Sequence, residues 1–331
     1  MKNVFVPNYY NAFRCIAGAC RHSCCVGWEI DVDEDTLRYY DALTGEMGAR
    51  LRASIDREAD PPCFRLNPDE RCPFLNENGL CDIITELGED SLCHICHDHP
   101  RFRNVLGDRV ELGLGLCCEA ASRLILSQTD PFSLVELPPE QAARERHAHE
   151  DPEELDGLSA ILIDYRDATI PILTDRTVPF SDRIRHVFAN LYVDLSESVT
   201  DALGDFASIA SLLRDMERLD PEWDTYLNAL EELTEDPLCE LDGEDDVAYE
   251  NLICYFLYRY MTTDSLMWPD TTLTRTVFAF YCTAIIHAIH RATGGKDFDS
   301  LCEIARMFSS EIEYSEENLE RLMREAEDAS F

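Results

Sequence analysis

The chemistry that this sequence could perform depends on its cysteines, which are concentrated in the first third of the chain. Eleven of the 15 cysteines lie between Cys15 and Cys118, in a chain of 331 residues. That density exceeds the roughly 8–10% level at which cysteine indicates cross-links or ligands rather than ordinary core packing. Thiols this close together bind either one another, as disulfides, or a metal ion.

The length and the N-terminal sequence favour a metal over disulfides. A chain of 331 residues buries a hydrophobic core without covalent help. Its opening residues, MKNVFVPNYYNAF, contain no continuous apolar run, so we expect no secretory signal and a cytoplasmic location. In that reducing compartment, dense cysteine indicates metal binding more often than disulfides or redox thiols.

The first cysteine segment is a glycine-containing loop with the spacing Cys20-x3-Cys24-Cys25, preceded by Cys15. Short spacing in such a loop lets several thiolates reach one centre. Adjacent side chains point in different directions, which leaves open that one of Cys24 and Cys25 is structural. A radical S-adenosylmethionine enzyme would carry C-x3-C-x2-C, and Gly27 stands where its third cysteine would be, so that class of enzyme is disfavoured.

The second cysteine segment has the spacing Cys72-x8-Cys81-x11-Cys93-x2-Cys96. A Cys-x2-Cys turn presents two thiolates to the same ion, and a second pair elsewhere completes tetrahedral coordination. Four thiolates suit zinc and a [4Fe–4S] cluster equally, so spacing alone leaves both open. Three histidines in the segment are more often neighbours of ligands than ligands themselves: His94, His97 and His99.

A third segment, Cys117–Cys118, could complete a site that the upstream cysteines begin. The other cysteines are interpreted as buried side chains, because free cysteine in an apolar setting behaves as a small hydrophobe. They are Cys63, Cys239, Cys254, Cys282 and Cys302. No Ser/His/Asp triad or carboxylate pair stands out among the 66 acidic residues, so no catalytic residue is assigned from the sequence.

The elements that must position these cysteines divide the chain into three regions. Residues 1–128 form a cysteine-rich metal-binding region, mostly irregular, with an amphipathic helix predicted over 33–58 and a second helix over 111–126. The prolines and charges of residues 129–152 indicate a linker. Residues 153–331 are predicted to be helical.

Apolar residues at spacings of three and four carry the prediction of helices in the third region. They recur within 184–195, 206–219, 252–261 and 277–289. Ser300 and Glu303 suggest a capping box for a later helix, and a charged helix is predicted from Tyr314 to Phe331. The expected fold class is mainly α, with the irregular cysteine-rich N-terminal part packed on an α-helical C-terminal part.

The net charge of −38 narrows the choice of partners. A surface so acidic repels nucleic acid and anionic membranes, so neither is expected as a partner. No run of about 18 apolar residues is evident either, and we expect no membrane span. The excess of acid reflects adaptation to a habitat or, alternatively, forms a face that receives a cationic substrate.

In four segments the chain resembles the flagellin lysine-N-methylase (FliB) family: RHSCCVGWEIDVD, CPFLNENGLCDI, LCHICHDHPRF and LCCEAASRLIL. That family is related to the cysteine-cluster zinc- or iron-chelating (YkgJ-like) proteins. The late stretch YENLICYFLYRYM is similar to the family's aromatic helix, so the resemblance spans roughly residues 5–290. The family's cysteine pattern falls on Cys20, Cys24, Cys25, Cys72, Cys81, Cys93, Cys96 and Cys117, whereas Cys118 stands where the family usually has proline.

The resemblance implies transfer of a methyl group from S-adenosylmethionine to lysine ε-amines of flagellin or another surface protein. It also implies a [4Fe–4S] cluster, with zinc as the alternative. Methyl transfer itself needs only a deprotonated amine aligned with the sulfonium methyl group, so the cluster either orients S-adenosylmethionine or holds the fold together. The alternatives are a non-catalytic zinc- or iron-binding module and a methylase acting on another peptide or a small molecule.

Overall fold

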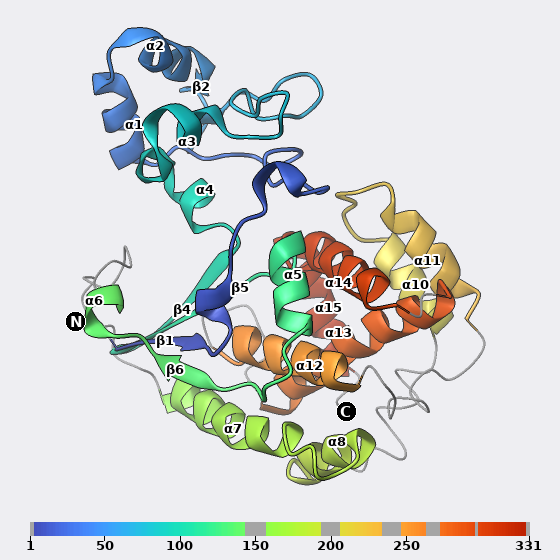
Figure 1. The fold of residues 1–331 in the computed structure, drawn as a ribbon. Coiled ribbons are helices and arrows are strands. Elements are labelled where there is room, and N and C mark those ends of the chain that lie inside the picture. Colours follow the sequence, from blue (N-terminus) through green and yellow to red (C-terminus); the bar gives the residue numbers. More distant parts are fainter. Residues whose placement is uncertain are drawn as a thin grey trace. The chain divides into compact units, whose positions relative to one another are not determined.

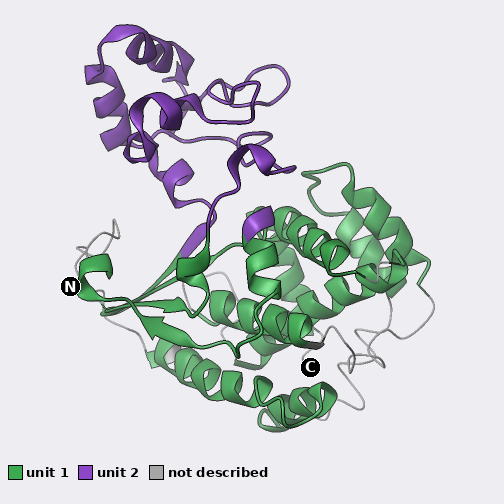
Figure 2. Cartoon of the chain, in the orientation of Figure 1, with its two compact units in different colours: residues 1–13, 103–117, 121–331 green, residues 14–102, 118–120 purple. Residues whose placement is uncertain are grey.

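The computed structural model describes residues 3–142, 157–192, 206–233, 246–262, 272–294 and 297–328. The chain divides into two compact units, which Figure 2 shows in separate colours. Unit 1 contains residues 1–13, 103–117 and 121–331, and unit 2 contains residues 14–102 and 118–120. Most of unit 2 is therefore a single insertion between two segments of unit 1.

A four-stranded sheet with the order β4-β5-β1-β6 belongs to unit 1, apart from the first two residues of β4 (Figure 1). Its strands are β1 (Asn3–Pro7), β4 (Arg101–Leu106), β5 (Arg109–Leu114) and β6 (Leu134–Glu136). Strand β1 runs parallel to β5, with Val4 opposite Val110, and antiparallel to β6. Gly107 has φ +63° in the two-residue connection between β4 and β5, a conformation that such tight turns require.

Strand β5 shows that the predicted helix over residues 111–126 is wrong in its first half. Residues 111–114 lie in the strand, and helix α5 (Glu119–Leu126) starts only afterwards. Glu111 lies fully buried in β5 because Arg166 of α7 (Gly157–Leu173) binds its two oxygens at 2.6 and 2.7 Å. A carboxylate inside a strand needs such a partner, and no local sequence pattern shows where that partner is.

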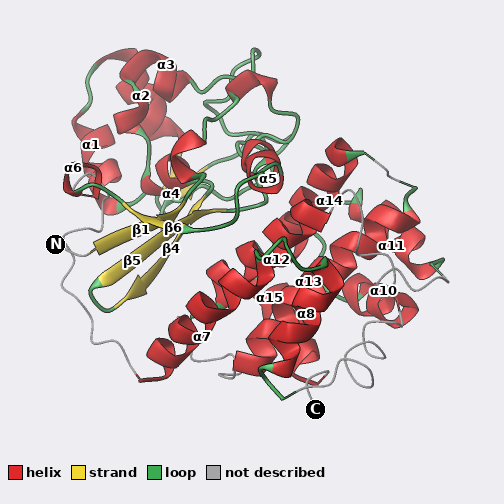
Figure 3. Cartoon of the chain, turned by 60° about the horizontal axis from the view of Figure 1, so that its bottom comes forward, coloured by secondary structure: helices red, strands yellow, loops and turns green. Residues whose placement is uncertain are grey.

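Helices make up most of unit 1, as Figure 3 shows in red. The prediction of a mainly α fold is thus confirmed, with a small sheet added to it. The further helices are α6 (Pro139–Ala142), α8 (Phe180–Ala189), α10 (Phe206–Arg214), α11 (Trp223–Glu231), α12 (Asp246–Tyr260), α13 (Thr272–Ala292), α14 (Phe298–Ile312) and α15 (Glu316–Asp328).

Helix α13 is the core helix of unit 1 and packs against α11, α12, α14 and α15. Every side chain from Thr274 to His290 is buried. Among the described residues it is also the one helix that could cross a membrane by length and composition alone, a match that the sequence analysis did not identify. Because 89% of its apolar window is buried inside the structure, the match is equally that of a core helix.

The start of α14 differs from its prediction. Asp297 is the N-cap and accepts a hydrogen bond from the amide of Ser300 at 2.8 Å. Glu303 does not return to the cap; it pairs with Arg306 at 2.6 Å on the next turn. The capping box is therefore wrong, because the helix begins at Phe298, earlier than the Ser300–Glu303 spacing implies.

Unit 2 consists of short elements joined by loops. They are α1 (Glu34–Ala42), α2 (Gly45–Ser54), β2 (Ile55–Asp56), β3 (Cys63–Phe64), α3 (Asp82–Leu87) and α4 (His94–Asp98). The helix predicted over residues 33–58 is two helices, α1 and α2, and the prediction is wrong beyond Ser54 because Ile55–Asp56 form strand β2. Asp33 begins α1 as its N-cap, accepting from the amide of Thr36 at 3.0 Å.

The two units divide the chain at places other than the predicted boundaries of 1–128, 129–152 and 153–331. Residues 3–13 and 103–117 belong with the helices of unit 1, because β1 pairs with β5. Within the predicted linker, β6 joins the same sheet, and residues 143–152 lie outside the described part of the chain.

Candidate metal centre

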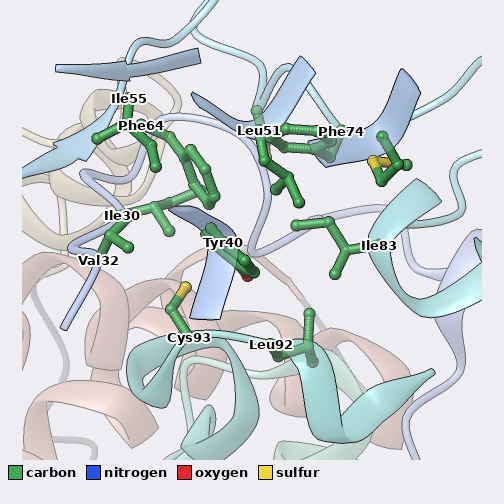
Figure 4. Close-up of a cluster of buried hydrophobic side chains, with 12 residues drawn as sticks. Ile30, Val32, Tyr40, Leu51, Ile55, Phe64, Phe74, Ile83, Leu92 and Cys93 are labelled. Atoms are coloured by element: carbon green, nitrogen blue, oxygen red, sulfur yellow. The ribbon is translucent and has the colours of Figure 1, made fainter. Parts of the chain in front are cut away.

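The hydrophobic core of unit 2 contains cysteine side chains among its apolar ones (Figure 4). Cys72 and Cys93 are buried members of this core, and Cys25, Cys81 and Cys96 pack against it. We call these five residues the inner cysteine group. In Figure 4 Cys93 points into the core near Tyr40, so its thiol is surrounded by apolar side chains and an aromatic ring.

Backbone hydrogen bonds draw the first three members of the inner cysteine group together. The amide of Cys72 donates to the carbonyl of Cys25 at 2.8 Å, which joins the first and second cysteine segments. An isolated β-bridge between Leu75 and Cys81 closes the loop that follows, and Cys81 then occupies the N-cap of α3. Segments far apart in the sequence thus present their thiols to one core.

Helix α4 positions the other two members. Cys93 is its N-cap and Cys96 lies three residues later, on the same face of the helix, with the two Sγ atoms 3.5 Å apart. Two thiolates bound to one tetrahedral zinc ion would be about 3.8 Å apart, given Zn–S bonds of about 2.3 Å. Asp33 anchors the start of α4 to α1, because its carboxylate accepts from the amide of His94 at 2.8 Å.

Burial and mutual contact set the acidity of these thiols. Burial raises the pKa of Cys72 to about 12, and the charges of Cys25 and Cys81 act in the same direction. The hydrogen bond between Cys93 and Cys96 lowers the pKa of Cys93 and raises that of Cys96, so the pair shares one proton. A bound cation would replace these protons, which is how metal binding to thiols releases them.

A second set of cysteines in unit 2, the outer cysteine group, consists of Cys15, Cys20, Cys24 and Cys118. The charges of Cys15 and Cys118 add to the raised pKa of Cys24, whose largest cause is its hydrogen bond to Cys25. Burial raises the pKa of Cys20 to about 11, with smaller contributions from Glu119 and Cys118. We group these four thiols because their charges affect one another, and Cys24 also contacts Cys25 of the inner group.

Glu119 fixes the loop that carries Cys20. Its carboxylate accepts from the amide of Arg21 at 2.9 Å and lies 3.7 Å from the Sγ of Cys20. Gly18 lets the same loop approach the turn between Cys72 and Cys81, since a Cβ there would come within 2.6 Å of the carbonyl oxygen of Asn78. The close approach requires glycine at position 18.

Cys117 is the one predicted ligand that the structure assigns to unit 1; the other seven belong to unit 2. Its side chain is 7% exposed. It is hydrogen-bonded to Tyr314, whose pKa is raised well above its ordinary value, chiefly by burial. Cys118, which stands where the family usually has proline, belongs to unit 2.

The cysteines interpreted as buried differ among themselves. Cys254, Cys282 and Cys302 are buried in α12, α13 and α14, and burial raises the pKa of each. Cys63 is only partly buried, in strand β3. Cys239 lies outside the described residues.

The donor set fits a thiophilic metal by its chemistry: soft sulfur ligands, clustered and shielded from water. Within the described part of the chain, however, no group of three or more Cys, His, Asp or Glu side chains converges in a geometry that could hold an ion. The histidines have other partners, with His94 facing Asp33 at 3.4 Å and His97 facing Asp98 at 3.0 Å. The Cys93–Cys96 pair, with its Sγ atoms 3.5 Å apart, supplies two thiols of the four that a tetrahedral site would need.

We predict that His99 makes stability fall at acid pH. Burial, assisted by the charge of Arg101, lowers the pKa of His99 from 6.5 to about 4. The unfolded chain therefore binds a proton near pH 6.5 that the folded chain refuses, so this contribution to stability is complete above pH 6.5 and is lost as the pH falls toward 4. This pKa shift corresponds to at most about 3 kcal/mol of folding free energy, and solvent screening reduces the expected contribution to about 2 kcal/mol.

Chemical denaturation of the wild type and of His99→Gln between pH 7 and pH 4.5 measures this effect. The wild type should lose about 2 kcal/mol more than the variant over that range. Acid release of metal would affect both proteins alike, so it cancels in the difference. Equal pH slopes would contradict the prediction.

Sequence reasoning missed the polar residues that hold the cysteine segments. Asp33 and Glu119 look like two of many acids, and their roles depend on contacts made only in the folded chain. It also missed a buried glutamate, Glu313, bound by two tyrosine hydroxyls. The one local signal for that site was the tyrosine-rich stretch YENLICYFLYRYM in α12.

Comparison with known proteins confirms the resemblance that the cysteine segments suggested. The chain is 29% identical over 144 residues to a lysine-N-methylase from Salmonella typhimurium and 30% identical over 150 residues to one from Salmonella choleraesuis. Each match covers 41% of this chain and 36% of the relative. The chain thus matches about a third of the length of these two relatives.

A third relative is the flagellar biosynthetic protein FliU of Salmonella muenchen. It is 28% identical over 151 residues, which cover 41% of this chain and 85% of FliU. No family model matches the chain. No solved structure matches it either.

Proposed function

We propose that this protein is a lysine N-methyltransferase that takes its methyl group from S-adenosylmethionine and acts in the cytoplasm on flagellin or a similar surface protein. The observation that carries the proposal is the similarity to two lysine-N-methylases, at 29% and 30% identity. The name of the third relative, a flagellar biosynthetic protein, supports a flagellar substrate.

The inner cysteine group would hold the metal, either a [4Fe–4S] cluster or zinc. Cys25, Cys72, Cys81, Cys93 and Cys96 supply more thiols than one tetrahedral ion needs, so the outer group is not required for a single site. When bound, the metal would supply positive charge that neutralises buried thiolates and would tie the first two cysteine segments together. Other residues of the chain would position these cysteines. The carboxylate of Asp33 binds the first turn of α4, and the backbone hydrogen bond between Cys25 and Cys72 joins the first two cysteine segments.

The remaining requirements of methyl transfer fall on the rest of the chain. A lysine amine must lose its proton before it attacks the sulfonium methyl group, and the two must be aligned. A net charge of −38 favours the approach of cationic lysine side chains over anionic partners.

The test is to purify the protein anaerobically and incubate it with S-adenosylmethionine and flagellin. Mass spectrometry should show flagellin gaining mass in steps of one methyl group, on lysine residues. Iron, sulfide and zinc analysis of the same preparation identifies the metal. Flagellin whose lysines have been fully acetylated is the control and should gain no mass.

The second candidate function is a metal-binding module without catalysis, which the clustering of cysteines in the core of unit 2 favours. It predicts bound zinc or iron, no binding of S-adenosylmethionine and no methylated product. A methylase of another peptide or a small molecule would instead bind S-adenosylmethionine and leave flagellin unchanged.

A further inference from the structure

Four glutamates among the described residues of unit 1 have buried side chains, and in three of them both oxygens have partners. Glu311 accepts from the backbone amides of Leu219 and Asp220, one on each oxygen. The other two form ion pairs. Glu111 binds Arg166 through both oxygens, at 2.6 and 2.7 Å. Both oxygens of Glu250 accept a hydrogen bond from Nε of Arg176 at 3.2 Å, and Oε2 also accepts one from Nη1 of Arg183 at 2.5 Å. Neither carboxylate has an oxygen left without a partner.

Glu313 is different, because all its partners lie on one oxygen. Its Oε2 accepts from the hydroxyls of Tyr255 and Tyr260, each at 2.7 Å, and pairs with Nη1 of Arg259 at 3.0 Å. Its Oε1 is buried and, within the described residues, has no hydrogen-bond partner. A buried carboxylate oxygen without a donor is unfavourable, and such groups in native proteins generally mark a missing water, ion or ligand.

The position of Glu313 in the chain makes it more unusual. It follows the last turn of α14, before α15, and a helix C-terminus disfavours a negative charge. The charge is held in place by the aromatic end of α12, which supplies Tyr255, Arg259 and Tyr260.

The two tyrosines fix the position of the carboxylate. The hydroxyl oxygen of Tyr255 accepts hydrogen bonds from the amide of Leu116 at 3.3 Å and from Nη1 of Arg259 at 2.7 Å. Its own proton is therefore donated to Glu313. Burial raises the pKa of Tyr255 and of Tyr260 well above 10, and both hydroxyls stay protonated donors. With Oε2 saturated, any further donor must bind at Oε1.

The surroundings already accommodate a cation. The Arg259 guanidinium lies 5.3 Å from the ring centroid of Tyr260 and 5.7 Å from that of Tyr314. Arg259 and Tyr314 are only partly buried, so the cluster reaches toward the surface. Aromatic faces beside a carboxylate are the surroundings that an alkylammonium group prefers. From α13, Cys282 faces the same carboxylate, and burial keeps that thiol protonated by raising its pKa well above 9.

We infer that Oε1 of Glu313 receives the ε-ammonium group of the methyl-accepting lysine and takes its proton. This inference rests on the proposed function. The proton moves from the lysine nitrogen to Oε1, and the freed lone pair forms the bond to the methyl carbon. The carbon–sulfur bond breaks with its electron pair going to sulfur, which leaves a neutral thioether and a methylated ammonium. Tyr255 and Tyr260 are positioning residues in this step.

Glu313→Gln tests the inference through its pH profile. At pH 7 the variant should lose about 10²- to 10⁴-fold in kcat/KM, the usual contribution of a general base. The deficit should shrink about tenfold per pH unit, since the amount of neutral lysine rises until its pKa of about 10.4. Glu313→Asp, which keeps a carboxylate, should recover much of the activity and the wild-type pH profile. A deficit that is constant across pH in Glu313→Gln would overturn the inference.

Glu250→Gln is the matched control, because it neutralises another buried glutamate of unit 1. Any loss of activity there should follow thermal stability and not depend on pH in this way. If Glu313→Gln does not fold, Glu313→Asp decides: much of the wild-type activity with the wild-type pH profile would support the inference. A folded Glu313→Asp protein that binds substrate normally but stays inactive at every pH would overturn it.

A binding measurement separates failure of this inference from failure of the proposed function. If the wild type methylates nothing, thermal shift with n-butylammonium, a minimal lysine side chain, still reports on Oε1. The wild type and Glu250→Gln should be stabilised by the amine, and Glu313→Gln should not. Equal shifts in all three proteins, or no shift in the wild type, would leave only a water molecule as the partner of Oε1 and overturn the inference.

Discussion

Serine in place of Cys93 or Cys96 is expected to abolish metal binding, because either change removes one of two core thiols that lie 3.5 Å apart. Loss of a ligand should cost at least the roughly 10–100-fold in affinity that loss of a supporting residue costs. Metal affinity contributes directly to folding, so the variants should also unfold at lower temperature than the wild type. Elemental analysis of metal per chain, with thermal unfolding, measures both effects.

Cys254→Ser is the control for this prediction. Cys254 is as fully buried as Cys93, but it lies in α12 of unit 1 among apolar side chains. A serine there should cost about 1–3 kcal/mol for a buried hydroxyl while the metal content stays at the wild-type level. Equal loss of metal in Cys93→Ser and Cys254→Ser would show that the division between ligand and core cysteines is wrong.

Arg166→Met is expected to destabilise unit 1 by about 3 kcal/mol, the lower end of the range for breaking a buried ion pair. It leaves Glu111 in the middle of β5 without the guanidinium that binds both its oxygens. The loss is not larger because Arg109 still contacts Oε1 of Glu111 at 2.5 Å. Denaturant unfolding followed by circular dichroism measures the free energy of unfolding.

Two further variants test whether the unpaired charge of buried Glu111 causes the destabilisation of Arg166→Met. Arg185→Met breaks an exposed pair with Asp182, whose side chains are 63% and 47% exposed, and should cost at most about 1 kcal/mol. The double variant Arg166→Met/Glu111→Leu removes the stranded charge and should recover most of the stability lost in Arg166→Met. A double variant no more stable than the single one would contradict this account of why β5 tolerates glutamate.

The helices of unit 1 and strand β5 show which parts of the fold could be predicted from the sequence. Helices such as α8, α10 and α13 were predictable because a periodic apolar stripe is written locally, in one stretch of chain. Strand β5 was not, because Glu111 looks like a helix residue until Arg166, 55 positions away, is seen to bind it. The pairing of β1 with β5 likewise joins segments far apart in the sequence, and no local sequence pattern predicts it.

The candidate site was likewise predictable only where the signal is local. Spacing identified the cysteine segments, and Cys93-x2-Cys96 forms the close pair that the spacing predicts. Spacing could not say that Cys25 packs against the core of unit 2 while its neighbour Cys24 is exposed, because adjacent positions in a loop carry no local signal of burial. Nor could it assign Cys117 to a different unit from Cys118, because that follows from the packing of the residues around them.

The insertion of unit 2 between β1 and β5 has a consequence for synthesis on the ribosome. β1 emerges first, but the strand it pairs with in parallel, β5, emerges about a hundred residues later. Closing so long a loop carries an entropic cost that falls if the intervening chain has already become compact. We therefore expect unit 2 to fold first, while β1 waits as an unpaired strand of the kind that chaperones protect from aggregation. With a metal bound to unit 2 as proposed, the supply of metal during translation would then influence how much of the nascent chain completes its sheet.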